Sequence, residues 1–213
     1  MDRWEKFNAF AVWMLKAGYL NLLWIGFTLA GLGIFGLFPS TGAMFTIIHK
    51  WLQKEPVGKL FPAFWKAYKK EFISLNKFGL FFILIGYILV YDFMFLHQNA
   101  GKLQWLIPVT GFIAISYVMT LLYFFPVYTQ YRMKFFQYIK QSFLIGASSL
   151  LETMIMFTSC MVLMIAVRFI PGIIPLFTGS VLAIVITWCG NRAFRKIKLK
   201  NPKKDYVSLN IMQ

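Results

Sequence analysis

The chain has 213 residues, of which 59% are hydrophobic and only 14% are charged. A soluble domain usually carries about 25% charged residues, and a soluble fold of this size needs more polar cover than that. The composition therefore excludes an ordinary soluble enzyme and predicts an all-α, polytopic membrane protein of the cell membrane. Its length fits one transmembrane domain, residues 1–190, followed by a basic cytoplasmic tail, residues 191–213.

The formal net charge is +15, from 22 Lys and Arg against 7 Asp and Glu. A basic balance of this size indicates either nucleic acid or an anionic membrane as partner. The cations lie in the segments between long apolar stretches, and the chain carries no nucleic-acid-binding motif. We therefore expect anionic membrane lipids as partners and no nucleic acid.

In chain order, the first residues mix acids with bases and lack the apolar core of a cleaved signal, so we expect them to be retained. A spanning helix needs about 20 mainly apolar residues. The sequence predicts about five such spans, at residues 17–38, 78–96, 105–127, 144–167 and 170–189. Pro171 predicts a tight turn at 168–172, between the last two.

Orientation follows from the cations in the connections, because Lys and Arg favour the cytoplasmic side. Segment 50–77 holds seven, segment 132–140 three, and the tail seven. An N-out, C-in topology places these 17 inside, and leaves three N-terminal cations, Lys102 and Arg168, five in all, outside. The sequence therefore predicts N-out, C-in.

The first apolar stretch leaves an alternative open, because it extends from about residue 7 to residue 52. It could hold one tilted span and a surface helix, or a hairpin of two spans with six crossings and an inward N-terminus. Residues 39–42, Pro-Ser-Thr-Gly, predict a helix stop followed by a restart. We favour five spans, because His49 and Lys50 suit lipid poorly.

Residues 43–77 predict a cytoplasmic amphipathic hairpin between spans one and two. Its second helix, beginning near Pro62, places Phe61, Trp65, Tyr68, Phe72 and Leu75 on one face and lysines on the others. A basic, aromatic-rich helix lies flat beneath a bilayer or docks in a partner's groove. Both readings stay open. The candidate partner-binding residues are Phe61, Phe64, Trp65, Tyr68, Phe72, Lys66, Lys69 and Lys70.

Ionisable residues within predicted spans are candidates for function. Glu152 is the foremost candidate, because it lies well inside the fourth predicted span. Its side chain should face other helices, where it could form a hydrogen bond with a hydroxyl on a neighbouring helix. Asp92 and Arg168 lie near span ends, where interfacial anchoring is the more common role.

The sequence offers few candidate catalytic residues. His49 and His97 are far apart in the predicted topology, and the chain has no HExxH, GxSxG or phosphate-binding glycine loop. Cys160 and Cys189 belong to no metal-binding cluster, so packing is their expected role. We predict a protein that is not an enzyme and uses no metal or cofactor.

Four motifs of the first third, LNLLW from Leu20, LFPSTGAMF from Leu37, KWLQKE from Lys50 and FPAFWKAYKKEF from Phe61, resemble the YesL-like bacterial membrane family in order and spacing. Members of that family are typically encoded beside carbohydrate ABC importers, mainly in Gram-positive bacteria. The resemblance implies an accessory role at such an importer and transfers no catalytic residue.

Two main hypotheses follow. In the first, the chain is a non-catalytic accessory protein that binds the permease subunits of a carbohydrate importer. In the second, it is a stand-alone carrier or channel for a solute or lipid, since interrupted spans and an intramembrane acid such as Glu152 often line sites. A membrane sensor is a weaker third, because the sequence has no recognisable signalling domain.

Overall fold

A computed structural model describes residues 3–98, 103–169 and 174–200. Within these residues the fold is all-helical. Four helices or parts of helices have the length and apolar composition needed to cross a membrane: residues 10–30, α3, α5 and α7. The chain is thus a helical membrane protein, as predicted. The elements are α1 (Arg3–Ala30), α2 (Ile34–Leu52), α3 (Leu60–Gln98), the 3-10 turn η1 (Gln104–Leu106), α5 (Ile107–Gln130), α6 (Phe135–Ser148), α7 (Leu150–Phe169) and α8 (Ile174–Lys200).

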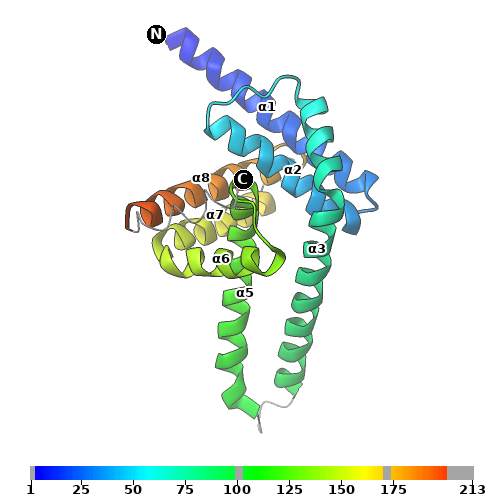
Figure 1. Ribbon diagram of the computed structural model, residues 1–213, viewed down its shortest axis with the longest axis vertical. Coiled ribbons are helices and arrows are strands. Elements are labelled where there is room, and N and C mark those ends of the chain that lie inside the picture. The colour runs from blue at the N-terminus through cyan, green and yellow to red at the C-terminus, as the bar shows by residue number, and fades with distance from the viewer. Residues whose placement is uncertain (1–2, 99–102, 170–173, 201–213) are drawn as a thin grey trace.

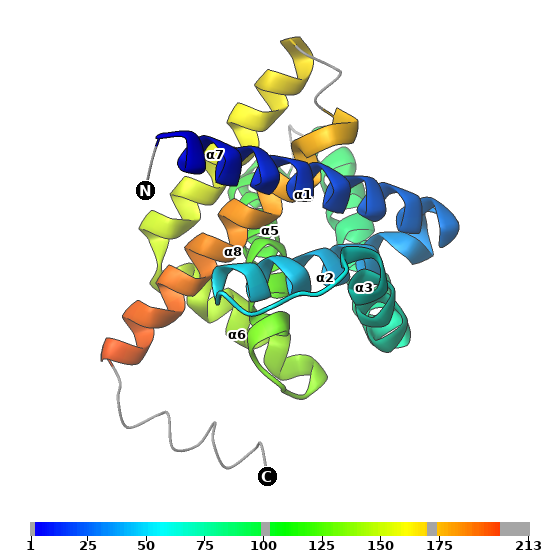
Figure 2. The ribbon, with the colours of Figure 1, turned by 90° about the horizontal axis from the view of Figure 1, so that it is seen from above.

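The helices follow two main directions. In Figure 1, α3 and α5 form a long hairpin that extends away from the other helices. From above, the first half of α3 is seen nearly end-on, whereas α1, α2 and α8 are seen from the side (Figure 2). The α1–α2 pair therefore crosses α3 steeply instead of running parallel to it.

Aromatic side chains fill the core where α2, α3 and α5 meet. Phe82 and Phe124 are buried, and their ring centroids lie 5.1 Å apart. Phe45 stacks on Phe125 with centroids 5.0 Å apart, which joins α2 to α5. Offset and tilted aromatic pairs of this kind add about 0.5–1.5 kcal/mol each beyond their buried area.

The predicted helix 17–38 is wrong, because the chain turns between α1 and α2. Leu32 and Gly33 have positive φ of 58° and 74°, outside the right-handed helical region, so the helix ends here; Gly33 adopts such a φ without strain. A Cβ on Gly36 would lie 2.3 Å from the Thr28 carbonyl oxygen, so only glycine permits this close approach of the two helices. The break therefore falls at residues 31–33.

The predicted helix stop at residues 39–42 is also wrong, because α2 continues through Pro39. These residues join neighbouring helices instead. Ser40 and Thr28 hydroxyls lie 2.6 Å apart, and Trp24 Nε1 donates to Thr41 Oγ1 at 3.0 Å. Gly42 lies against Leu75 of α3. The motif that resembled a turn is thus a packing surface inside a helix.

Helix α3 extends well beyond the second helix of the predicted hairpin. The second helix was predicted to begin near Pro62, and α3 does begin at Leu60, with Pro62 in its first turn, after a break at residues 53–58. The same helix then continues without interruption to Gln98, over 39 residues. The amphipathic segment and the second predicted span are therefore one helix, so the segment does not lie flat beneath a span that stands upright.

The fourth predicted span, 144–167, is also divided. Helix α6 ends at Ser148, Ser149 leaves helical geometry with ψ 57°, and α7 begins at Leu150. The Thr153 hydroxyl lies 3.0 Å from both the Gly146 and Ser149 carbonyl oxygens, so it can satisfy a carbonyl freed by the break. Hydroxyl bonding of this kind lets a helix break persist in a membrane protein.

Helix α8 extends further than predicted. The fifth span was expected to end at residue 189, followed by a tail, but α8 continues to Lys200 and carries the first basic residues of that tail. The predicted turn around Pro171 and the beginning of that span lie outside the described residues, as does the tail after Lys200.

Candidate functional site

The predicted aromatic face of α3 is largely covered by the chain itself. Phe27 of α1 lies at the centre of this contact, with ring centroids 5.0 Å from Phe64 and 5.1 Å from Tyr68. Phe64 and Tyr68 are buried, and the Tyr68 hydroxyl donates to the Phe27 carbonyl oxygen at 3.4 Å. These two side chains stabilise the α1–α3 contact and are not open to a partner.

The other residues of the predicted interface stay accessible to different degrees. Phe61 and Trp65 are 51% and 43% exposed, at the edge of the contact with Phe27, and Phe72 is half-buried. Lys69 Nζ lies 5.0 Å from the Trp65 ring centroid, which is a cation–π contact. Lys66, Lys69 and Lys70 are all exposed. The accessible part is thus mainly cationic.

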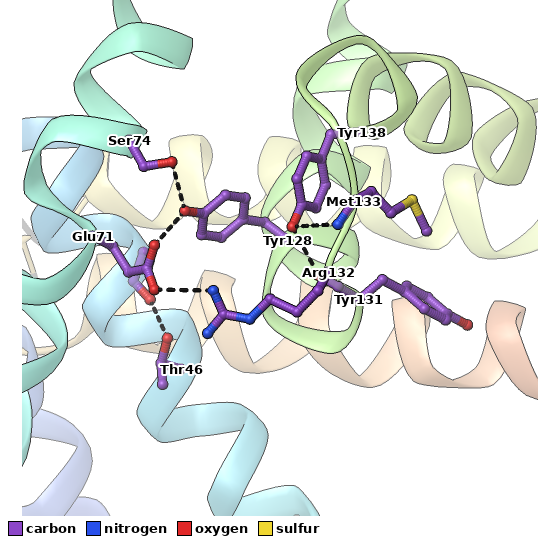
Figure 3. A network of polar contacts seen from close by, with 9 residues as sticks. Thr46, Glu71, Ser74, Tyr128, Tyr131, Arg132, Met133 and Tyr138 are labelled. Carbon is purple, nitrogen blue, oxygen red and sulfur yellow. Dashed lines mark hydrogen bonds and ion pairs between the residues drawn. The ribbon is translucent and has the colours of Figure 1, made fainter. Parts of the chain in front are cut away.

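A polar network joins α3 to the end of α5, and the sequence analysis missed it (Figure 3). The Tyr128 hydroxyl donates to Glu71 Oε2 and lies 3.1 Å from Ser74 Oγ. Arg132 Nη1 lies 3.4 Å from Glu71 Oε1. Glu71 is only 16% exposed, whereas Arg132 is 66% exposed, so the Tyr128 hydroxyl is the better-buried partner of Glu71.

Tyr138 of α6 closes the loop that follows α5. Its hydroxyl accepts from the Met133 backbone N–H at 3.1 Å and donates to the Tyr131 carbonyl oxygen at 2.9 Å. Burial is the largest cause that raises the pKa of Tyr138, so the hydroxyl remains a donor at neutral pH. The loop is therefore fastened beside the Glu71 network.

The helical spacing of the buried residues in α3 could have identified Glu71 as a buried position. The buried stripe of α3 follows a 4-3-4-3-4 spacing, and Glu71 occupies one position of this stripe. The face predicted from the sequence, Phe61, Trp65, Tyr68, Phe72 and Leu75, shares Tyr68 and Leu75 with this stripe but takes Phe72 in place of Glu71. The stripe consists of Phe64, Tyr68, Glu71, Leu75, Phe78 and Phe82.

Glu152 faces other helices, as predicted, but its depth was misjudged because α6 and α7 are separate. It lies in the first turn of α7 and is 1% exposed. Its partners are cations of α8: Lys196 Nζ at hydrogen-bond distance and Arg192 Nε at 3.6 Å from Oε1. These cations are 48% and 44% exposed. These ion pairs join α7 to α8 through Arg192 and Lys196, both of which belong to the segment predicted as a tail.

Asp92 and Arg168 are exposed near the ends of α3 and α7. In the part of the chain that the structure describes, neither makes an ion pair, and the structure does not bring them near Glu152. Cys160 and Cys189 are free thiols. Among the described residues, no group of three or more His, Cys, Asp or Glu side chains could hold a metal ion.

One family model and three known proteins match this chain, and the three proteins match over most of its length. The family model described as "Protein of unknown function, DUF624" matches residues 18–93, which hold the α1–α2–α3 contacts described above. No solved structure matches.

Three Bacillus subtilis (strain 168) proteins are similar to this chain. It is 33% identical to the uncharacterized protein YteU over 90% of this chain and 84% of that protein. For the uncharacterized protein YesL the identity is 31%, over 92% and 93% of the two chains. For the uncharacterized protein YesV it is 32%, over 88% and 91%. The chain therefore belongs to the YesL-like DUF624 family of proteins.

Proposed function

We propose that this chain is a non-catalytic accessory membrane protein that associates with the permease subunits of a carbohydrate ABC importer and supports its assembly or uptake. Membership of the YesL-like family carries the proposal, because members are typically encoded beside such importers. The proposal places the protein in a bacterial cell membrane.

The contacts of the carboxylates of Glu71 and Glu152 favour an accessory role over that of a carrier. Glu71 is bonded to Tyr128 and paired with Arg132, and Glu152 is paired with Lys196 and Arg192. A carboxylate that binds a solute or an ion needs an open coordination position, whereas these two hold helices together. The exposed apolar sides of α3 and α5 supply room for a membrane partner or lipid: examples are Leu80, Tyr87, Met94 and Phe112.

Affinity purification of the tagged full chain from its native membrane in mild detergent tests the proposal. Permease subunits are expected in the eluate in a fixed ratio to the chain. Their absence, together with solute transport by the purified chain in liposomes, would favour the carrier alternative. A matched control uses a tagged, unrelated helical membrane protein expressed at the same level.

The finer topology forms part of the proposal. We propose that segment 50–77 and the end of α8 face the cytoplasm, with the N-terminus outside if five segments cross and inside if α2 crosses as well. Single cysteines introduced into a chain without Cys160 and Cys189 test this by labelling intact cells. Labelling of Lys54→Cys from outside the cell would overturn the orientation.

A further inference from the structure

Helix α3 carries a second face, opposite to its buried stripe, that the chain leaves uncovered. Lys59 directly precedes the helix, and Lys66, Lys70 and Lys77 follow at intervals of seven, four and seven residues, which place all four on one side. All four are exposed, as is Ile73 between them, at 72%. We call Lys59, Lys66 and Lys70 the lysine face.

No carboxylate of the described chain compensates the lysine face. Glu71 is the nearest acid along the helix, but it points toward α5, where Tyr128 and Arg132 engage it (Figure 3). In the described ranges none of these lysines forms an ion pair. Like charges at i and i+4, as at Lys66 and Lys70, destabilise a helix, so the chain itself gains nothing from this arrangement.

The length of α3 decides which acidic partner can reach this face. A helix of 39 residues is about 58 Å long, whereas a bilayer with its headgroups measures about 40–45 Å. The apolar run begins after Lys77, so the surplus length lies on the lysine side. Lys70 and Lys66 lie about 10 Å and 16 Å beyond Lys77 along the axis, whereas a headgroup layer is about 5–8 Å thick.

We propose that the lysine face of α3 is a docking surface for an acidic protein segment in the aqueous phase, with lipid headgroups reaching only Lys77. Phe64 and Tyr68, which the sequence offered to a partner, are instead buried against Phe27. Charge complementarity would set the orientation of the partner and speed its association. The inference specifies the chemistry of a partner, and it holds whether or not that partner belongs to an importer.

The test uses the full chain in phosphatidylcholine nanodiscs and a fluorescein-labelled decaglutamate peptide as the acidic probe. The wild type should bind with an affinity that falls as salt rises. Lys66→Gln with Lys70→Gln should weaken binding about tenfold, because two adjacent charges are lost. The matched control, Lys134→Gln with Lys140→Gln, removes two exposed lysines from the beginning of α6 and from within it, and should change the affinity less than about twofold.

Equal binding by the two double variants would overturn the proposal, since the face would then be merely solvated. A lipid arm uses mixed phosphatidylglycerol and phosphatidylcholine nanodiscs and counts retained lipids by native mass spectrometry. Lys77→Gln should lower phosphatidylglycerol retention, and the Lys66 and Lys70 variant should not. The opposite result would place the face in the headgroup layer and also overturn the proposal. Permease co-purification of the same variants separates failure of this inference from failure of the importer proposal.

Discussion

Two contact regions hold this bundle together by different means. The amino-terminal joint, between α1, α2 and the first half of α3, uses glycines, hydroxyls and aromatic rings, as at Gly36 and the Thr28–Ser40 pair. The carboxy-terminal joint, between α7 and α8, uses the buried Glu152 and two cations. The first depends on close approach and should tolerate no added volume, whereas the second depends on charge balance.

The largest expected effect is at the amino-terminal joint, in Gly36→Ala. The new methyl would lie 2.3 Å from the Thr28 carbonyl oxygen and 2.8 Å from that of Phe27, and both are backbone atoms that cannot rotate away. We expect α1 and α2 to separate, with a loss of about 3 kcal/mol or more in the free energy of unfolding. Thermal unfolding in detergent measures it.

The matched control is Gly26→Ala on the same helix pair. A Cβ at Gly26 meets no atom within 4 Å, so alanine should leave the joint intact and stabilise α1 by up to about 1 kcal/mol. If Gly36→Ala unfolds at the wild-type temperature, close approach is not what holds this joint.

At the carboxy-terminal joint, the two sides of the ion pair should differ. Lys196→Ala leaves the Glu152 carboxylate buried, with only the more distant Arg192, so we expect a loss of about 3 kcal/mol. Glu152→Gln leaves two half-exposed cations that water can solvate, so the loss should be about 1 kcal/mol.

The double variant sharpens this contrast. Adding Glu152→Gln to Lys196→Ala removes the stranded charge and should recover part of the stability, which a double-mutant cycle measures. A purely additive cycle would mean that Glu152 and Lys196 do not interact.

The sequence predicted some parts of this structure well and others poorly, for physical reasons. Composition and run length predict membrane helices because lipid requires about 20 apolar residues, whatever the packing. The breaks at residues 31–33 and Ser149 were missed because hydrophobicity does not change there; the first depends on local backbone conformation and the second is accommodated by a hydroxyl from Thr153.

The candidate sites were harder to predict than the spans. Which face of α3 is buried depends on where Phe27 packs: on the predicted aromatic face Tyr68 is buried, whereas Phe61 and Trp65 stay exposed. Pairing of Glu152 with Lys196 joins residues 44 positions apart, and helical spacing within one segment carries no information on such a contact.

The Glu71 network combines features of both joints and should respond in an intermediate way. Tyr128→Phe removes the hydroxyl that donates to a largely buried carboxylate, and we expect a loss of about 1–2 kcal/mol. Arg132→Ala removes a partner that is 66% exposed, so the loss should stay below about 1 kcal/mol. Chemical or thermal unfolding of both variants tests the order, and a larger effect of Arg132→Ala would contradict it.

The smallest expected effect concerns pH, and it arises in the amino-terminal joint, whose described residues form no ion pair with one another. His49 near the end of α2 has a buried Nδ1 without a hydrogen-bond partner among the described residues. Burial lowers the pKa of His49 from 6.5, and Glu55 partly opposes this. Because the unfolded chain then binds the proton more readily, stability is complete above pH 6.5 and falls as pH drops through 6.5 toward the folded pKa.

The slope from this one group is at most about 1.4 kcal/mol per pH unit. His49→Gln should flatten the fall in unfolding temperature between about pH 7.5 and 5.5 without abolishing it, since carboxylates also contribute at the acid end. Gly26→Ala serves as the contrasting variant: its effect on stability should be constant over this range, because the substitution changes no titrating group and meets no neighbouring atom. If both variants show the wild-type pH profile, the acid sensitivity does not arise from His49, and the amino-terminal joint is insensitive to pH because it depends on shape alone.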